Sequence, residues 1–298
     1  MTLEQLRIFV AVAEREHVSA AARALPLAQS AVSAAISALE ARHGAALFDR
    51  IGRRVALTDA GRMLLGQARV ILADVAEAQA ALAEHGAGVR GSLSVFASQT
   101  IAGYWLPRHL VAFRRAYPRV ELRLAVGNSA DAAKAVEEGR ADVGFVEDDA
   151  PGERLTRERL ALDGLILVVA PSHPWAGRSE LSREELEAGE WVLREPGSGT
   201  RSALERALTR RGVALERLRV ALTLPSNEAK RAAVEAGLGA TALSASVAAP
   251  SLEAGLLAQV PFEIESRAFS LLRRPSRRPH RVVDALRAVI REGIGAPR

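Results

Sequence analysis

The sequence contains no cysteine, and this absence removes several kinds of chemistry at once. Disulfide bonds, thiol redox sensing, cysteine-ligated zinc and a cysteine nucleophile are all excluded. The six histidines are scattered, at positions 17, 43, 85, 109, 173 and 280, so none forms a close pair at metal-ligand spacing. We therefore expect no metal site, and no motif indicates a resident cofactor.

The sequence also lacks an apolar run long enough to span a bilayer. Its first residues, MTLEQLRIFVAVAERE, are mildly acidic and lack the basic start and apolar core of a signal peptide. A cytoplasmic protein without a membrane partner is expected. The 298 residues, 49% of them hydrophobic, suffice for two or three domains with buried cores.

Charge of one sign is not in large excess, because the net charge is +5 from 40 basic and 35 acidic residues. Such a balance does not by itself indicate nucleic-acid binding. The basic charge is instead local: residues 42–62 contain five arginines and two aspartates. An arginine-rich edge suits contacts with phosphate groups, although a solvated surface would have the same composition.

Residues 19–61 follow the order of a winged helix-turn-helix: a short helix, a tight turn, a second helix and an arginine-rich hairpin. Standard start and stop signals set the expected boundaries. These are a first helix capped by Thr2 with Gln5, a short helix capped by Ser19 and stopped by Pro26, a recognition helix over 29–43 ended by Gly44, and a hairpin over 47–57.

The recognition helix has one apolar face, Val32, Ile36 and Leu39, so its other face is free to meet DNA. The predicted DNA-binding residues are Gln29, Ser30 and Ser33 on this helix, with Arg50 and Arg53 on the wing. Gln29 can pair with adenine in the major groove, or it can simply cap the helix. Ser33 can reach a base or a phosphate group, or it can be a solvated serine without a DNA contact. Arg53 and Arg54 are neighbours and therefore face opposite sides of the wing; the choice of Arg53 over Arg54 rests on the family resemblance given below.

A long helix over about 59–85 follows the wing, where Thr58 can cap it. Its apolar residues alternate by four and three, which is typical of a coiled-coil dimer. The seam is Leu64, Ala68, Ile71, Val75, Ala78 and Leu82. The alternative is a helix packed on its own domain.

From residue 92 the pattern changes to alternating strands and helices, which predicts an α/β region with parallel sheets. The expected strands are 92–97, 120–126, 142–146, 165–170, 191–194, 219–224, 240–243 and 268–272. The expected helices are 103–116, 130–139, 182–188, 200–212, 227–236 and 279–292. Breaks near 162 and 266 suggest two similar lobes.

Three loops that follow strands suit a small anion, because ligands bind at the carboxyl ends of strands in open α/β sheets. The predicted effector-binding residues are Ser98, Gln99, Thr100, Asn128, Ser198, Gly199, Thr200, Arg201 and Asn227. Each loop taken singly can instead be a helix cap. Arg201 can complement the anion or only pair with Glu205 one turn later.

Taken together, these segments resemble the LysR-type transcriptional regulators over essentially the whole chain. The N-terminal match is carried by Leu6 and Phe9, Ser19-Ala20-Ala21-Ala22, Gln29-Ser30-Ala31-Val32-Ser33, Gly44, Leu47-Phe48-Asp49-Arg50 and Leu57-Thr58-Asp59-Ala60-Gly61. The strings REPGSGTR at 194–201 and SNEAKRAAVEAGLG at 226–239 resemble the branch that controls carbon-fixation and sulfur-assimilation genes.

The resemblance implies an architecture and a set of partners. It implies a DNA-binding domain over 1–58, a dimerisation helix over 59–88, and an effector-binding domain over 89–298 that resembles periplasmic binding proteins. Lobe I is expected over about 91–161 and 267–298, and lobe II over about 162–266. The implied partners are interrupted palindromes in double-stranded promoter DNA, a small anionic metabolite, further copies in a dimer of dimers, and RNA polymerase for an activator.

Some positions depart from the family pattern. Ala28 replaces the usual Ser or Thr cap of the recognition helix, which costs about 1 kcal/mol of capping. Ala34, Ala35 and Ala38 replace longer polar side chains, so readout relies more on the wing and on DNA shape.

Two other functions compete with the regulator. An enzyme is disfavoured because Ser98, His109 and Asp142 form no nucleophile elbow or triad motif. A cytosolic solute-binding or architectural protein, with an N-terminal domain that serves only dimerisation, would bind ligand but no promoter DNA.

Overall fold

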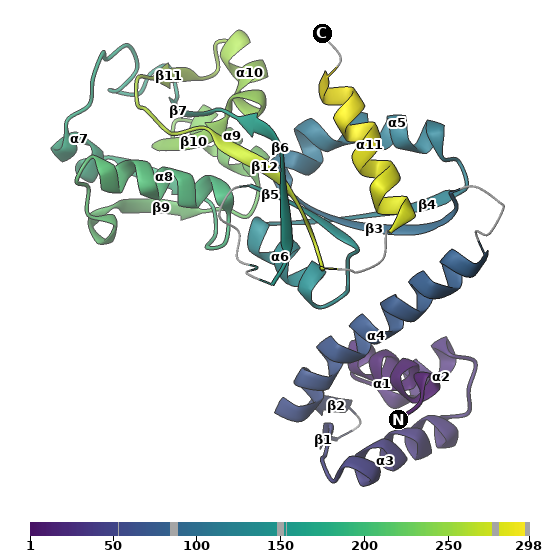
Figure 1. Ribbon diagram of the computed structural model, residues 1–298. Helices are drawn as coiled ribbons and strands as arrows, with labels where there is room; N and C mark the ends of the chain where they lie inside the picture. Colours follow the sequence, from purple (N-terminus) through teal and green to yellow (C-terminus); the bar gives the residue numbers. More distant parts are fainter. Residues whose placement is uncertain (53, 84–88, 148–151, 153, 276–279, 296–298) are drawn as a thin grey trace. The chain divides into compact units, whose positions relative to one another are not determined.

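The computed structural model describes the chain except for residues 53, 84–88, 148–151, 153, 276–279 and 296–298 (Figure 1). The described chain divides near Arg90 into an N-terminal unit and a C-terminal unit. In the described ranges no single helix has the length and hydropathy to span a membrane; α2 and α3 meet that test only as a pair bent by 112°.

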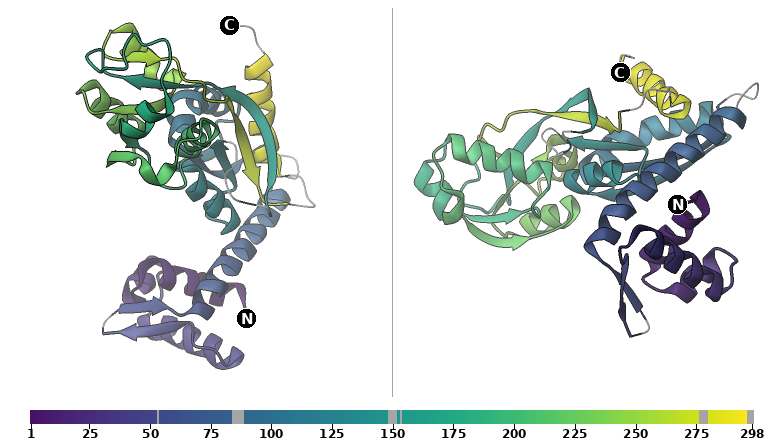
Figure 2. Two further views of the ribbon diagram at one scale, coloured as in Figure 1. Left: turned by 90° about the vertical axis from the view of Figure 1, so that its left-hand side faces the viewer. Right: turned by 60° about the horizontal axis from the view of Figure 1, so that its bottom comes forward.

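The N-terminal unit is a small helical domain with a two-stranded wing (Figure 2). Its core contains Phe9, Val12, Val32 and Leu39, all without exposed surface. The elements are α1 (Leu3–Arg15), α2 (Val18–Ala24), α3 (Gln29–His43), β1 (Phe48–Ile51), β2 (Arg54–Leu57) and α4 (Asp59–Ala83).

Most of the predicted helix boundaries in this unit are confirmed. Thr2 and Gln5 form the capping box, with N–O distances of 3.0 and 3.1 Å. Gly44 ends α3 in the left-handed conformation, at φ +63°. The predicted cap at Ser19 is wrong: α2 begins at Val18, and the Ser19 hydroxyl hydrogen-bonds His17 Nδ1 at 3.0 Å. A serine inside the first turn can no longer reach the amides that it would cap.

The wing is fixed to both of its flanking helices by hydrogen bonds. Glu40 Oε1 on α3 accepts the backbone N–H groups of Leu47 at 2.7 Å and Phe48 at 3.2 Å. Thr58 Oγ1 donates to the Ala46 carbonyl at 2.7 Å and accepts the N–H of Gly61 at 3.0 Å. A Cβ at Gly61 would lie 2.1 Å from the Leu47 carbonyl oxygen, so this close approach of α4 to the wing requires glycine.

The first three residues of the apolar seam on α4 pack into the core of the N-terminal unit. Ala68 is fully buried there, and Leu64 and Ile71 pack against the same core. For these positions the alternative interpretation, packing within the domain, is the observed one. Val75 and Ala78 follow as half-buried residues, and the side chain of Leu82 lies outside the described residues.

The C-terminal unit contains two five-stranded sheets, each flanked by helices (Figures 1 and 2). Lobe I has the strand order β4-β3-β5-β12-β6 and lobe II the order β11-β7-β10-β8-β9. Lobe I consists of β3 (Gly91–Ser98), a π-helical turn η1 (Ile101–Trp105), α5 (Leu106–Ala116), β4 (Val120–Gly127), α6 (Ser129–Glu137), β5 (Val143–Glu147), β6 (Thr156–Asp163), β12 (Arg267–Arg273) and α11 (Arg281–Gly295). Lobe II consists of β7 (Leu165–Val169), α7 (Arg183–Ala188), β8 (Glu190–Leu193), α8 (Gly199–Arg210), a 3₁₀ turn η2 (Leu215–Arg217), β9 (Arg219–Thr223), α9 (Asn227–Glu235), β10 (Ala240–Ser244), α10 (Ala245–Glu253) and β11 (Ala258–Val260).

The prediction of parallel sheets is only half right, because both sheets are mixed. β3 pairs in parallel with β4 and β5, and β8 pairs in parallel with β9 and β10. In contrast, β12 is antiparallel to β5 and β6, and β7 is antiparallel to β10 and β11. These antiparallel strands adjoin the points where the chain crosses between lobes, so no helical crossover orients them.

Three elements were not predicted: β6, β11 and α10. The strand β6 lies at a sheet edge and exposes four of its eight residues, and its sequence TRERLALD forms no apolar run. The strand β11 has only three residues. The helix α10 contains Pro250 in its interior and begins directly after β10, which hides its start.

We expect Gly61→Ala to destabilise the N-terminal unit by about 1–3 kcal/mol, the usual cost of overpacking. The added methyl group would clash with the Leu47 carbonyl and separate α4 from the wing. The matched control is Gly66→Ala on the same helix, where nothing lies within 4 Å and the better helix former stabilises by about 0.5–1 kcal/mol. Urea unfolding of both variants checks this, and equal effects would contradict it.

A second prediction concerns His109, which is buried on α5 against the Trp105 ring, 4.6 Å between centroids. Burial and the neighbouring Arg108 guanidinium lower the pKa of His109 to about 4. Above pH 6.5 the imidazole is neutral whether the chain is folded or not. Between pH 6.5 and 4 only the unfolded chain takes up the proton, so stability falls by roughly 3 kcal/mol across this window. Unfolding free energies of the wild type and His109→Gln should therefore converge as the pH falls; a constant difference would contradict the assignment.

Candidate functional site

The surface expected to meet DNA is a groove between α3 and the wing. Gln29, Ser33 and Ser37 line it from the helix, and Arg50 and Arg54 line it from the wing. Gln29, Ser30 and Arg50 are exposed and Ser33 is half-buried. The buried face of α3 is Val32, Ile36 and Leu39, as predicted.

Two details bear on the predicted DNA contacts. Arg53 lies outside the described residues, so its direction stays a prediction. The N-cap residue of α3 is Ala28, and no side chain hydrogen bond caps this end. The first amides of α3 are therefore available to a phosphate group, which is favoured at a helix N-terminus.

His17, Ser19 and Arg54 also line this groove; the first two were not predicted, and Arg54 was set aside in favour of Arg53. His17 is the N-cap residue of α2 and Ser19 lies in its first turn, and the two are joined by their own hydrogen bond. Arg54 pairs with Ile51 in the hairpin register, one position from the Arg50–Val55 pair. No signal in the sequence identified His17 and Ser19, because their approach to the wing depends on the packing of α1, α2 and α3.

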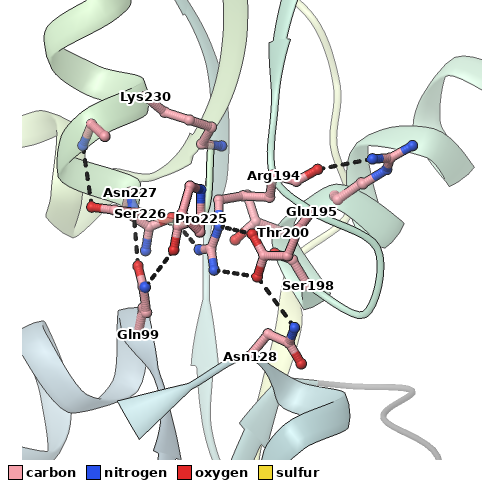
Figure 3. Close-up of polar contacts among 12 residues, drawn as sticks. Gln99, Asn128, Arg194, Glu195, Ser198, Thr200, Pro225, Ser226, Asn227 and Lys230 are labelled. Carbon is pink, nitrogen blue, oxygen red and sulfur yellow. Dashed lines mark hydrogen bonds and ion pairs between the residues drawn. The ribbon is translucent and has the colours of Figure 1, made fainter. Parts of the chain in front are cut away.

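In the C-terminal unit, the predicted effector residues from the two lobes meet one another (Figure 3). Gln99 of lobe I donates to the Pro225 carbonyl at 2.5 Å and accepts the N–H of Asn227 at 3.1 Å. Asn227 Nδ2 donates to Thr100 Oγ1 at 3.0 Å. Loops that follow β3 and β9 are thus joined by hydrogen bonds, of which the one between Asn227 and Thr100 is buried, at the carboxyl ends of strands from both sheets.

Arg267 lies at the centre of this interface, on the first residue of β12. Its guanidinium donates to Asp163 at 2.9 Å, to Thr200 Oγ1 at 3.0 Å and to Thr100 Oγ1 at 3.3 Å. Glu147 Oε1 lies 3.5 Å from the same group. A fully buried arginine therefore connects hydroxyl groups of both lobes with two carboxylates of lobe I.

Three further predicted residues, Ser98, Ser198 and Gly199, lie where the two lobes meet. Ser98 Oγ at the end of β3 is buried and, within the described part of the chain, has no hydrogen-bond partner. Ser198 is buried at the start of α8. A Cβ at Gly199 would lie 2.8 Å from Glu147 Cβ, so glycine is needed for this contact between lobes.

Arg194 and Glu195 form a bidentate ion pair beside Asn128. Arg194 Nε and Nη2 donate to the Glu195 carboxylate at 2.8 Å each, and Nη1 donates to Asn227 Oδ1 at 2.9 Å. Asn128 Nδ2 of lobe I donates to Glu195 Oε1 at 3.2 Å. Burial raises the pKa of Glu195, but the hydrogen bonds and charge of Arg194 outweigh it, so the pKa is lowered.

Arg201 and Lys230 are the other two basic residues described near the interface. Arg201 pairs with Glu205 at 2.7 Å, the alternative that the sequence left open, and also donates to the Arg194 carbonyl at 2.9 Å. Lys230 is buried and donates to the Ala242 carbonyl at 2.7 Å. Burial, with the charges of Arg194 and Arg267, lowers its pKa well below the ordinary value.

The charged residues Asp163, Arg194, Lys230 and Arg267 were not predicted as site members. Arg194 and Lys230 belong to the two strings quoted above, REPGSGTR and SNEAKRAAVEAGLG. The sequence therefore indicated these segments, but it did not indicate that the side chains of Arg194 and Lys230 point into the interface. Asp163 and Arg267 are register partners on β6 and β12. They stand 104 residues apart in the chain, so only the pairing of the crossover strands brings them together.

The polar groups at the interface between the lobes are suited to binding a small molecule. Among the described residues, no group of three or more histidine, aspartate or glutamate side chains gathers as metal ligands. Hydroxyl, amide and guanidinium groups converge instead, and these recognise an anion.

Comparison with known proteins identifies both units. Residues 3–62 match the model of the bacterial regulatory helix-turn-helix protein, lysR family, and residues 86–295 match the LysR substrate binding domain. The chain is 36% identical over 287 residues to the uncharacterized HTH-type transcriptional regulator YeiE of Escherichia coli K12, covering 96% of this chain and 95% of that protein.

Two further relatives extend the comparison. The chain is 34% identical over 281 residues to the probable RuBisCO transcriptional regulator of Cyanophora paradoxa, covering 93% and 87% of the two chains. It also resembles the crystal structure of full-length CbnR complexed with its target DNA, with 25% identity, a TM-score of 0.67, and coverage of 98% and 99%.

These matches support a regulator and not an enzyme, because the relatives are named as transcriptional regulators. The predicted fold class, a winged helix-turn-helix followed by a two-lobed α/β domain, is confirmed. The chain belongs to the LysR family of transcriptional regulators.

Proposed function

We propose that this LysR-type regulator binds a small anionic metabolite between the two lobes of its C-terminal unit, and that the bound anion changes its action at promoter DNA. The observation that carries the proposal is the convergence of buried cations with hydroxyl and amide groups from loops of both lobes. Arg194, Lys230 and Arg267 are each 3% exposed or less. Guanidinium groups that converge with hydroxyl and amide groups are the donors with which proteins bind anions, so the site favours a ligand with negative charge.

Ser98 supports the same proposal from a different direction. A buried hydroxyl without a partner costs roughly 1–3 kcal/mol, so a ligand that accepts its hydrogen bond recovers that energy. Thr100 and Gln99 are its neighbours on the same loop, and both already touch lobe II. An anion held here would contact both lobes at once.

The mechanism is a shift of population between arrangements of the lobes. A ligand moves such an equilibrium only by binding one arrangement more tightly than the other. Groups from both lobes meet at this site, so their spacing determines affinity for the anion. Coupling to DNA then follows from the free-energy difference between the two arrangements.

The assembly is part of the proposal. We assign dimerisation to residues 59–85, with the free part of the seam beginning near Val75, and a dimer of dimers to the complete regulator. Such a tetramer suits interrupted palindromic sites, because half-site spacing follows the symmetry of the protein. An activator of this kind would also contact RNA polymerase, and its place of action is the cytoplasm, on the nucleoid.

We expect Arg50→Ala to weaken binding to all DNA sequences alike, because an arginine on phosphate carries no sequence information. The slope of log affinity against log salt should become shallower by about 0.9, the contribution of one phosphate contact. Fluorescence anisotropy at several salt concentrations measures this, with Arg178→Ala in the C-terminal unit as a control of equal charge change. An unchanged slope would remove Arg50 from the interface.

A second prediction separates ligand binding from stability at Ser98. Ser98→Ala should leave the ligand-free protein as stable as the wild type, or more stable by about 1 kcal/mol, since an unpartnered hydroxyl is lost. It should also reduce the rise in melting temperature caused by inorganic phosphate. Ser270→Ala is the matched control: its buried hydroxyl also lacks a partner among the described residues, but it shares a strand face with Leu272, which packs on α6. Equal phosphate responses of both variants would argue against the site.

A further inference from the structure

The Arg194–Glu195 pair has the geometry with which proteins bind carboxylate and phosphate ligands. Two parallel N–H groups of one guanidinium meet two oxygens of one carboxylate, each at 2.8 Å. Both partners belong to lobe II and are adjacent in sequence. No ligand is needed to form the pair, so it satisfies the guanidinium from within the chain.

A third hydrogen bond makes the Glu195 carboxylate resemble a bound ligand more closely. Asn128 Nδ2 of lobe I donates to Glu195 Oε1 at 3.2 Å. The carboxylate thus accepts N–H groups from both lobes, as an anion held between them would. Asn128 Nδ2 also donates to the Pro196 carbonyl at 3.5 Å, and the N–H of Ala130 on α6 donates to the Gly197 carbonyl at 3.3 Å, so the loop that carries Glu195 contacts lobe I at three consecutive residues.

The other two cations at the interface are less accessible to an incoming anion. The guanidinium of Arg267 is enclosed by Asp163 and Glu147, whose side chains are 5% and 4% exposed. Lys230 donates to the Ala242 carbonyl beneath α9. Glu195 is more hydrated than either of these two carboxylates, with 26% of its side chain exposed. Its transfer to water therefore costs least, and it uncovers two donors of Arg194.

We propose that Glu195 is an internal competitor of the effector: its carboxylate occupies the binding fork of Arg194, and the anionic group of the effector takes its place. This inference rests on the function proposed above and specifies its chemistry. The effector is an anion that presents two oxygens on one centre, a carboxylate, a sulfate or a phosphate group. It accepts both N–H groups of Arg194 and the amide of Asn128, while Glu195 turns into solvent.

An internal competitor sets the concentration at which the regulator responds. The apparent affinity for the anion is reduced by the fraction of molecules in which Arg194 is free. The exchange also substitutes a ligand for Glu195 as the group that joins Asn128 to Arg194. At this place in the interface the ligand then takes over the link from lobe I to Arg194, which makes the arrangement of the lobes dependent on its size, while the hydrogen bonds of Gln99 and Thr100 to lobe II remain.

The test uses the full-length protein and three probes: inorganic phosphate, sulfate and acetate, each against chloride at equal ionic strength. Glu195→Gln removes the charge and one acceptor oxygen, so apparent anion affinity should rise about tenfold, as expected for loss of one charge-assisted competitor. Glu205→Gln is the matched control, because Glu205 is also half-buried and paired with an arginine, Arg201, but makes no contact with lobe I in the hydrogen bonds of the described chain. It should change affinity less than twofold. Affinities come from the rise of melting temperature with anion concentration.

The outcomes are distinct. Tighter binding by Glu195→Gln than by the wild type, with Glu205→Gln unchanged and binding lost in Arg194→Gln, supports the inference. Equal affinity of the wild type and Glu195→Gln for an anion that does bind overturns it and leaves the proposed function intact. Absence of binding in the wild type and in both glutamine variants overturns the anionic effector itself. Glu195→Ala makes the same comparison if the glutamine variant does not fold.

Discussion

The guanidinium of Arg267 is fully enclosed, so the protein itself has to supply every charge and hydrogen bond that this group needs. Asp163 supplies the nearest charge and is its register partner across β12 and β6. Thr100 and Thr200 supply the oxygens from the two lobes. One ion pair therefore lies beside both crossings of the chain, and the contacts between lobes are arranged around it. Breaking such a buried pair from one side leaves an uncompensated charge, at a cost of about 3–5 kcal/mol.

Local signals in the sequence predicted most of the fold. The capping box at Thr2, the left-handed Gly44 and the apolar face of α3 all depend on residues a few positions apart, and the structure has them as expected. The elements that were missed depend on distant partners. β6 is an edge strand with polar residues, and it is held in place by β12, more than a hundred residues later. The direction of β12 and β7 follows from passage between lobes, which no periodicity records.

The same division applies to the candidate site. Gln99, Thr100 and Asn227 could be named because each follows a strand and opens a helix, and they do contact one another. Arg267 begins a strand and has no neighbouring loop motif, so sequence reasoning had no reason to single it out. The role of Arg201 also depended on a choice between partners, and the helix supplies Glu205 one turn away. The contacts of side chains whose partners lie in the other lobe could be identified only from the three-dimensional structure.

Glu40 joins the end of α3 to the first two residues of the wing, and so the helix and the hairpin form one rigid frame. The residues that hold this frame are separate from those exposed on α3. Ala34, Ser37 and Ala38 contribute nothing to the core, because their side chains face outward. New side chains at these positions would leave the core intact and would cost only helix propensity, up to about 0.7 kcal/mol for each alanine replaced. A rigid frame with a small, unoccupied outer face therefore makes the operator preference of such a regulator easy to change in evolution, one residue at a time.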